Sequence, residues 1–320
     1  MDSKKPGSGW GTLWSPKSGA PAALLILYVA NAVFTPRFAT VSNTLNMLLQ
    51  VSTTMFVAVG MTFAIASRGV DLTVGSTMAL VSVIVALLIN QGMAVAIPAA
   101  LGGALLVGLL NGFVISRLKL EPMITTLAAL IMWRGVAQVV GDGQLVPFVH
   151  PTFEALGKGY LGHIPIQVVI AAVVIASAFF CIRSTLFGRH LVAVGDNEEA
   201  SRLMGVSPNR VKLAAYTISG LLSGLAGVVL AGRLGAGQPM AALGWETDAI
   251  AAAVMGGTFL GGGQGSVFPT LAGVLLLGMM YNILNLEGTI TPWWQLVLRG
   301  GFLLLVVIFQ QRIAQRKRAA

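Results

Sequence analysis

The chain has 320 residues, of which 56% are apolar and 10% charged, and its mean hydropathy is +0.83. This composition excludes an ordinary water-soluble globular protein and indicates an integral membrane protein. The formal net charge of +9 comes without a basic patch interleaved with aromatic residues, so we do not expect nucleic-acid binding. Cys181 is the one cysteine of the chain, which excludes an intrachain disulfide.

Apolar segments bounded by charges, prolines or glycine clusters predict about ten transmembrane helices. Two stretches, 72–116 and 249–286, contain no Asp, Glu, Lys or Arg. Each is about twice as long as the ~20 residues that one spanning helix needs, so each holds a pair. Long apolar runs without period-two alternation also argue against a barrel. The fold class is therefore an all-α integral membrane protein, with spans expected at 20–34, 42–67, 77–90, 94–116, 123–140, 164–182, 213–232, 249–260, 267–286 and 293–310.

The first of these segments has some features of a secretory signal. Lysines precede it, and Ala30-Asn31-Ala32 has the form of a cleavage site. Because residues 1–19 would make a long leader and nine more spans follow, we expect an uncleaved first helix. Cleavage would leave nine spans with the same orientation.

The second and third spans are separated by a break at residues 68–75 (Arg-Gly-Val-Asp-Leu-Thr-Val-Gly). A membrane tolerates such a break only where protein or a water-filled cavity satisfies the backbone. Asp71 is accordingly a candidate for lining a pathway or for ordering the break, and the N-cap of the following helix is an equally good interpretation.

Polar residues within the later spans are further pathway candidates. Arg134 must pair or face water, because burial of its charge in lipid is costly. Asn111 and Asn282 could face a polar route, as could Gln138 and Asn285, but hydrogen bonds between helices explain such residues equally well. The glycine pairs 108/112, 220/224 and 257/261 predict close helix packing.

The largest polar stretch between spans is residues 183–212. Within it, Asp196 or Asn197 can cap a short helix over 198–204, Glu198 and Glu199 fall in its first turn, and Gly205 can end it. An ordinary capped surface helix is the alternative to a functional role for this segment.

Basic residues predict the orientation of the chain. With the N-terminus inside, 15 of the 20 Lys and Arg residues fall on the cytoplasmic side and three on the other, at Arg37, Lys158 and Arg233. We therefore expect a cytoplasmic N-terminal tail (1–19), a transmembrane domain (20–311) with the cytoplasmic loop 183–212, and a cytoplasmic C-terminal tail (312–320).

Residues 67–76, 199–205 and 245–266 form three motifs in this order along the chain. Together they resemble permeases of the ATP-binding-cassette (ABC) importer class, specifically the monosaccharide family that imports ribose, xylose and galactose. Residues 199–205 resemble its Glu-Ala-Ala-x-x-x-Gly coupling motif, with Ser201 in place of the second Ala. Residues 67–76 are similar to its Gly-Ile-Asp-Leu-Ser-Val-Gly-Ser signature, apart from Ser67-Arg68. Residues 245–266 are similar to its Glu-Leu-Asp-Ala-Ile-Ala…Gly-Gly-Thr pattern, apart from Thr247.

This resemblance implies the ABC importer permease fold and a location in the bacterial inner membrane. It also implies a second permease subunit, identical or different, a cytoplasmic ATPase that uses ATP-Mg, and a periplasmic sugar-binding protein. It assigns coupling to the ATPase to the short cytoplasmic helix, at Glu198, Glu199, Ala200, Ser201 and Gly205, of which the small residues would seat closely in the partner.

The sequence gives no sign of catalysis or of a cofactor in this chain. Lys158 in Gly157-Lys158-Gly159 does not belong to a phosphate loop, and His150, His163 and His190 lack metal-ligand spacing. A multispan enzyme would need clustered catalytic groups. An ion-coupled secondary transporter remains the main alternative, although it would normally place acids deep within spans, and the 11 acids here fall almost wholly at span ends or in loops.

Overall fold

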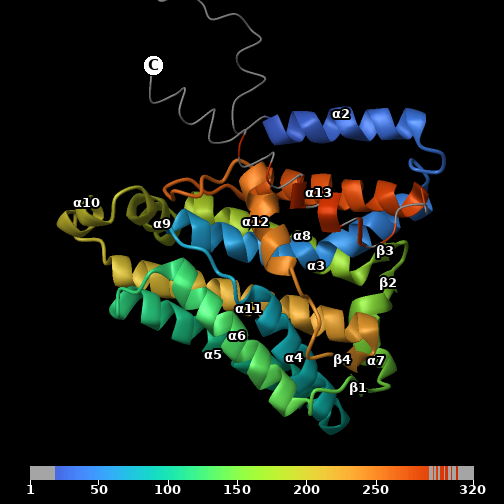
Figure 1. Ribbon diagram of the computed structural model, residues 1–320, viewed down its shortest axis with the longest axis horizontal. Coiled ribbons are helices and arrows are strands. Elements are labelled where there is room, and N and C mark those ends of the chain that lie inside the picture. Colours follow the sequence, from blue (N-terminus) through green and yellow to red (C-terminus); the bar gives the residue numbers. More distant parts are fainter. Residues whose placement is uncertain are drawn as a thin grey trace, which may run out of the picture.

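The computed structural model describes residues 19–287 and scattered positions between 291 and 308, so the predicted span 293–310 and both tails lie largely outside it. Its secondary structure is almost entirely helical (Figure 1). The elements are α2 (Gly19–Phe34), α3 (Val41–Ala66), α4 (Val74–Leu88), η1 (Ile89–Gln91), α5 (Met93–Arg117), α6 (Pro122–Val140), β1 (Val146–Pro147), α7 (Pro151–Lys158), β2 (Tyr160–Leu161), β3 (Ile164–Pro165), α8 (Ile166–Ser184), α9 (Leu186–Asp196), α10 (Glu198–Leu203), α11 (Pro208–Leu234), β4 (Ala236–Gly237), α12 (Trp245–Met255) and α13 (Val267–Glu287).

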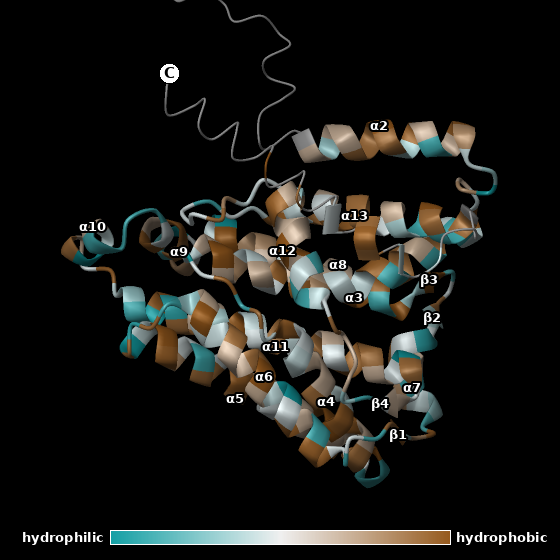
Figure 2. Cartoon of the chain, viewed as in Figure 1, coloured by the Kyte–Doolittle hydropathy of each residue, from teal (hydrophilic) through white to brown (hydrophobic). Residues whose placement is uncertain are grey.

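Seven of the described helices are long and apolar enough to cross a membrane: α3, α4 with η1, α5, α6, α8, α11 and α13. The all-α membrane class is thereby confirmed, whereas the count of about ten spans is not. The helix α2 is apolar but shorter, at 16 residues. Hydrophilic residues gather at the two ends of the bundle, around α10 and around α7 with the short strands (Figure 2). We call these the α10 end and the α7 end.

The predicted span 249–260 is not a single spanning helix. α12 has 11 residues and reaches about 17 Å, roughly half of the ~30 Å hydrocarbon core. The chain still crosses the bundle here, because β4 pairs with β1 at the α7 end and Gly263 donates to Ala66 O at the α10 end (3.2 Å). The crossing consists of the non-helical residues 238–244, then α12, which lies steeply across α3 and α13 in Figure 1, and then the loop 256–266.

Helix α11 is the centre of the bundle and packs against α3, α4 and α5. It packs closely on α5, where a Cβ on Gly220 would lie 2.8 Å from the Gly108 α-carbon. The predicted close packing through 108/112 and 220/224 is confirmed, because Gly112 abuts the Leu213 backbone and Gly224 abuts Ala104 in the same way. The pair 257/261 lies in a loop, so the prediction of a helix–helix contact there is wrong.

Candidate functional site

The short helix α10 is built as its sequence predicts, and it projects from the bundle in Figure 1. The Asn197 side chain caps it by accepting from the Ala200 N–H at 2.9 Å. The helix ends one residue earlier than predicted, and Gly205 follows with φ of +82°. A Cβ at Gly205 would meet nothing within 4 Å, so there is space for a side chain. Glycine is favoured here because of the positive φ and not because of its neighbours.

The preceding helix α9 (Leu186–Asp196) was not predicted within the loop 183–212. Thr185 caps it by accepting from the Gly188 N–H at 3.1 Å. Its buried residues Gly188, Leu191 and Gly195 recur at helical spacing, which is the signal that could have revealed it. Gly195 sits so close to Ala66 O that no side chain fits between them, and α9 thereby holds α10 at a fixed place beside the end of α3.

The side chains of α10 divide into an inner and an outer set. Glu198 faces the protein and forms ion pairs with Lys212 of α11 (2.5 Å) and Arg202 (3.5 Å). Ser201 is 1% exposed, and its hydroxyl has no hydrogen-bond partner among the described residues. In this chain the small side chain at 201 packs inside the protein, whereas we expected it to face a partner.

The outer set of α10 includes two residues that sequence reasoning missed. Leu203 is 86% exposed and Met204, which follows it, is 71% exposed. Glu199 is also exposed, and Ala200 is half-buried. We call Glu199, Leu203 and Met204 the α10 tip. Beside it lies an open groove of about 450 Å³, lined by Lys119, Arg202, Gly205, Val206, Ser207, Pro208 and Asn209. The tip exposes the apolar side chains of Leu203 and Met204, and the groove beside it contains the basic residues Lys119 and Arg202. Such a surface is suited to contact with another protein.

A second polar site lies within the membrane bundle, at the break between α3 and α4. Asp71 is 1% exposed and accepts three hydrogen bonds, from the Thr73 N–H (3.0 Å), the Thr73 hydroxyl (2.6 Å) and the Ser219 hydroxyl of α11 (2.7 Å). Asn111 of α5 donates to the Thr73 hydroxyl at 2.8 Å. Asp71 and Asn111, predicted separately, thus belong to one network that satisfies the broken backbone from neighbouring helices. In this chain both are enclosed by protein.

The other two pathway candidates lie apart from that network. Asn282 of α13 exchanges two hydrogen bonds of 2.8 Å with Asn43 at the start of α3, so it joins two helices. Arg134 of α6 is 8% exposed, and its Nη1 donates to Pro239 O (3.0 Å) and Ala241 O (2.6 Å). Gln138 and Asn285 are exposed. Arg68, whose depth the sequence left open, is exposed at the end of α3.

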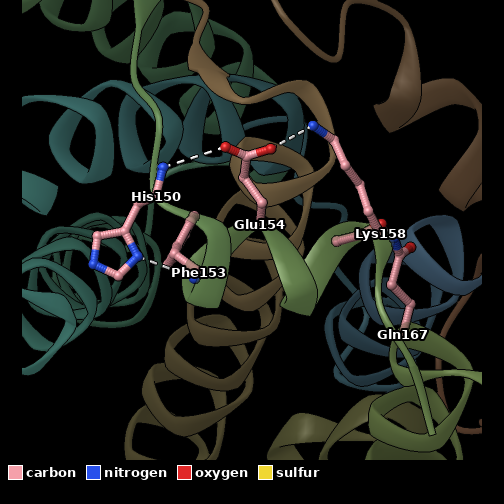
Figure 3. A network of polar contacts seen from close by, with 6 residues as sticks. His150, Phe153, Glu154, Lys158 and Gln167 are labelled. Atoms are coloured by element: carbon pink, nitrogen blue, oxygen red, sulfur yellow. Dashed lines mark hydrogen bonds and ion pairs between the residues drawn. The ribbon is translucent and has the colours of Figure 1, made fainter.

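The α7 end is more ordered than a connecting loop. His150 Nδ1 caps α7 by accepting from the Phe153 N–H at 3.2 Å, and Glu154 accepts from both the His150 N–H (3.2 Å) and Lys158 (2.7 Å) (Figure 3). The hydrogen bond from Lys158, with that from His150, lowers the pKa of Glu154. Gln167 of α8 donates to Gly157 O, so α7 is also fixed to the transmembrane bundle.

Comparison with known proteins decides the family. The family model described as "Branched-chain amino acid transport system / permease component" matches residues 43–307. The chain belongs to this permease family. The permease is 38% identical over 316 residues to the L-arabinose transport system permease protein AraH of Escherichia coli (strain K12), a match that covers 98% of this chain and 96% of the relative.

Two further relatives are ribose permeases. The ribose import permease protein RbsC of Haemophilus influenzae is 36% identical, and that of Bacillus subtilis (strain 168) is 38% identical, each over 92% of this chain and 93% of the relative. No solved structure matches. The resemblance to monosaccharide importer permeases, predicted from the three motifs, is confirmed.

Proposed function

We propose that the permease is the membrane-spanning subunit of an ATP-driven importer of a monosaccharide in the bacterial inner membrane. The observation that carries this proposal is the nearly full-length similarity to permeases of L-arabinose and ribose. We expect a pentose to be transported, selected mainly by a periplasmic sugar-binding protein.

The permease has three partners in the proposed importer. A second permease subunit, identical or different, completes the pathway. A cytoplasmic ATPase binds ATP-Mg and contacts the α10 tip, whose apolar residues Leu203 and Met204 are exposed at 86% and 71%. The binding protein approaches the α7 end. The permease itself serves as a transport subunit and leaves ATP hydrolysis to its partner.

Ion-coupled transport needs a direct test. In the sequence, the distribution of acidic residues argues against it, but the structure weakens that argument. Asp71 and Asp248 are 1% and 6% exposed inside the bundle, and Glu246 lies close to the buried start of α4. These acids do lie in a loop or at a helix start, as predicted, with Asp71 in the break between α3 and α4 and Glu246 and Asp248 in the first turn of α12, but such positions are buried in this fold. Family membership, not the acid distribution, favours the ATP-driven mechanism.

Transport in proteoliposomes tests the proposal. Vesicles that hold the permease, its cognate ATPase and internal ATP-Mg, with binding protein outside, should accumulate L-arabinose, ribose or xylose and should not accumulate leucine. Vesicles with the permease alone are the control, with and without a proton or sodium gradient. Sugar uptake that needs only an ion gradient would refute the ATP-driven mechanism, and uptake of leucine in place of sugars would refute the substrate class.

Single cysteines in a Cys181→Ala background test the orientation, in which the α10 end is cytoplasmic. Gly195 is unsuitable, because any side chain there collides with Ala66 O, whereas Glu199 and Lys158 are exposed. A membrane-impermeant thiol reagent added outside intact cells should label Lys158→Cys and spare Glu199→Cys until the membrane is opened. The charge asymmetry of the loops predicts this result, and labelling of Glu199→Cys in intact cells would reverse the orientation.

A further inference from the structure

Residues 238–244 are a non-helical segment placed inside the bundle. A Cβ on Gly237 would lie 2.7 Å from Ser82 O, and one on Gly75 would lie 2.5 Å from Ala242 O. Because Gly75 and Ser82 are seven residues apart on α4, the segment runs about 10 Å along that helix. The segment therefore enters the bundle from β4 at the α7 end and follows α4, which with η1 is one of the candidate membrane spans, as far as its first turn (Figure 1).

One side of the segment is held by the protein. Arg134 donates to Pro239 O and Ala241 O, and the Ser82 hydroxyl accepts from the Gln238 N–H at 3.2 Å. A guanidinium suits this task because it offers several donors in a fixed plane. Arg134 is thus a positioning residue for the segment, which accounts for an arginine within a predicted span.

The other side of the segment is open. Met240 is 46% and Leu243 57% exposed, and Thr247 in the first turn of α12 is also exposed. Gln138 of α6 is exposed beside them, with its Nε2 3.0 Å from Met240 Sδ. Irregular backbone is not found facing lipid within the hydrocarbon region, and it occurs there only when it is covered by protein or lines a water-filled cavity.

We propose that Gln138, Met240, Leu243 and Thr247 form one wall of the water-filled route that the sugar takes through the importer. This inference rests on the proposed function, in which a second permease subunit supplies the opposite side of the route. The wall mixes apolar groups, which suit the C–H faces of a sugar, with one amide and one hydroxyl, which suit its hydroxyls. Few polar contacts favour passage, because a solute that is bound too tightly does not leave.

Thiol accessibility tests the wall in the complete importer. Met240→Cys, Leu243→Cys and Thr247→Cys are made one at a time in the Cys181→Ala background and reconstituted with the ATPase and binding protein. A charged methanethiosulfonate is applied during ATP-driven uptake. Val173→Cys is the matched control, because Val173 is 61% exposed and is the eighth of the 19 residues of α8.

The three wall cysteines should react about tenfold faster than Val173→Cys or more, since the reagent needs the ionised thiol, which forms in water and not in hydrocarbon. Modification should block uptake, and an excess of the transported sugar should slow the reaction. If the three cysteines react no faster than Val173→Cys while uptake continues, or if full modification leaves uptake unchanged, the wall is assigned wrongly although the transport function stands. Absence of ATP-driven uptake by the unmutated importer would instead refute the proposed function.

Discussion

Leu203→Asp combined with Met204→Asp should abolish ATP-driven uptake while the permease remains folded and abundant in the membrane. Both side chains are exposed, at 86% and 71%, so charges there are solvated in the permease alone. An ATPase that buries this tip would have to desolvate two carboxylates without partners, which costs free energy. We expect ATPase association to weaken about a hundredfold, equal to roughly 2.8 kcal/mol, as measured by binding of the purified ATPase to the permease in nanodiscs.

Two controls separate a lost contact from a damaged fold. Val149→Asp places a carboxylate on a residue that is 85% exposed at the α7 end, and it should leave ATPase binding unchanged. Gly205→Val strains the positive φ that ends α10 and should impair coupling, whereas Gly205→Asn tolerates that conformation and should retain it. Unchanged ATPase binding by the double aspartate variant would show that the α10 tip is not the ATPase contact.

Asp71→Leu should prevent the permease from reaching a stable folded state. The substitution leaves the Thr73 N–H, the Thr73 hydroxyl and the Ser219 hydroxyl buried without their acceptor. Each buried donor left unpaired costs about 1–3 kcal/mol, and Asp71, Thr73 and Ser219 are all at most 1% exposed, so solvent does not reach the broken bonds from outside. We expect little protein in the membrane and, for what is purified, a much lower melting temperature in detergent.

The nature of the substitution distinguishes the network from simple packing. Asp71→Asn keeps the shape and one acceptor oxygen, so it should be milder than Asp71→Leu. Ser52→Ala is the matched control, because Ser52 is 2% exposed and, among the described residues, its hydroxyl donates to Leu48 O of its own helix alone. Wild-type abundance and melting of Asp71→Leu would show that the carboxylate does not hold the break together.

Local chemistry explains which parts of the structure could be predicted. Asn197 and Gly205 could be predicted to mark the two ends of α10, because a side-chain cap and a positive φ depend on residues within one turn of each other. The long helices follow from runs of apolar residues, and the α5–α11 crossing follows from the spacing of glycines. Each of these signals is contained in a short stretch of chain.

Tertiary contacts explain what could not be predicted. Hydropathy predicted a transmembrane helix at 249–260, because a short apolar helix followed by an apolar loop has the same average hydropathy as one long apolar helix. The partners of Arg134 lie more than one hundred residues away in sequence, at Pro239 and Ala241, so neither its burial nor its role could be read from its own segment. Nothing in the sequence around Ser201 indicated that its side chain is buried within the protein.

The pairing of α3 with α13 has a mechanical consequence. The two helices are joined near one end by the reciprocal amide bonds of Asn43 and Asn282 and, farther along, by the hydroxyls of Thr62 and Thr270, which lie 2.9 Å apart. Sliding one helix along the other would break both links, of which the contact between Thr62 and Thr270 is buried. We therefore expect α3 and α13 to move together. A rearrangement that opens a route through the membrane would then have to bend at non-helical segments elsewhere, such as residues 238–244.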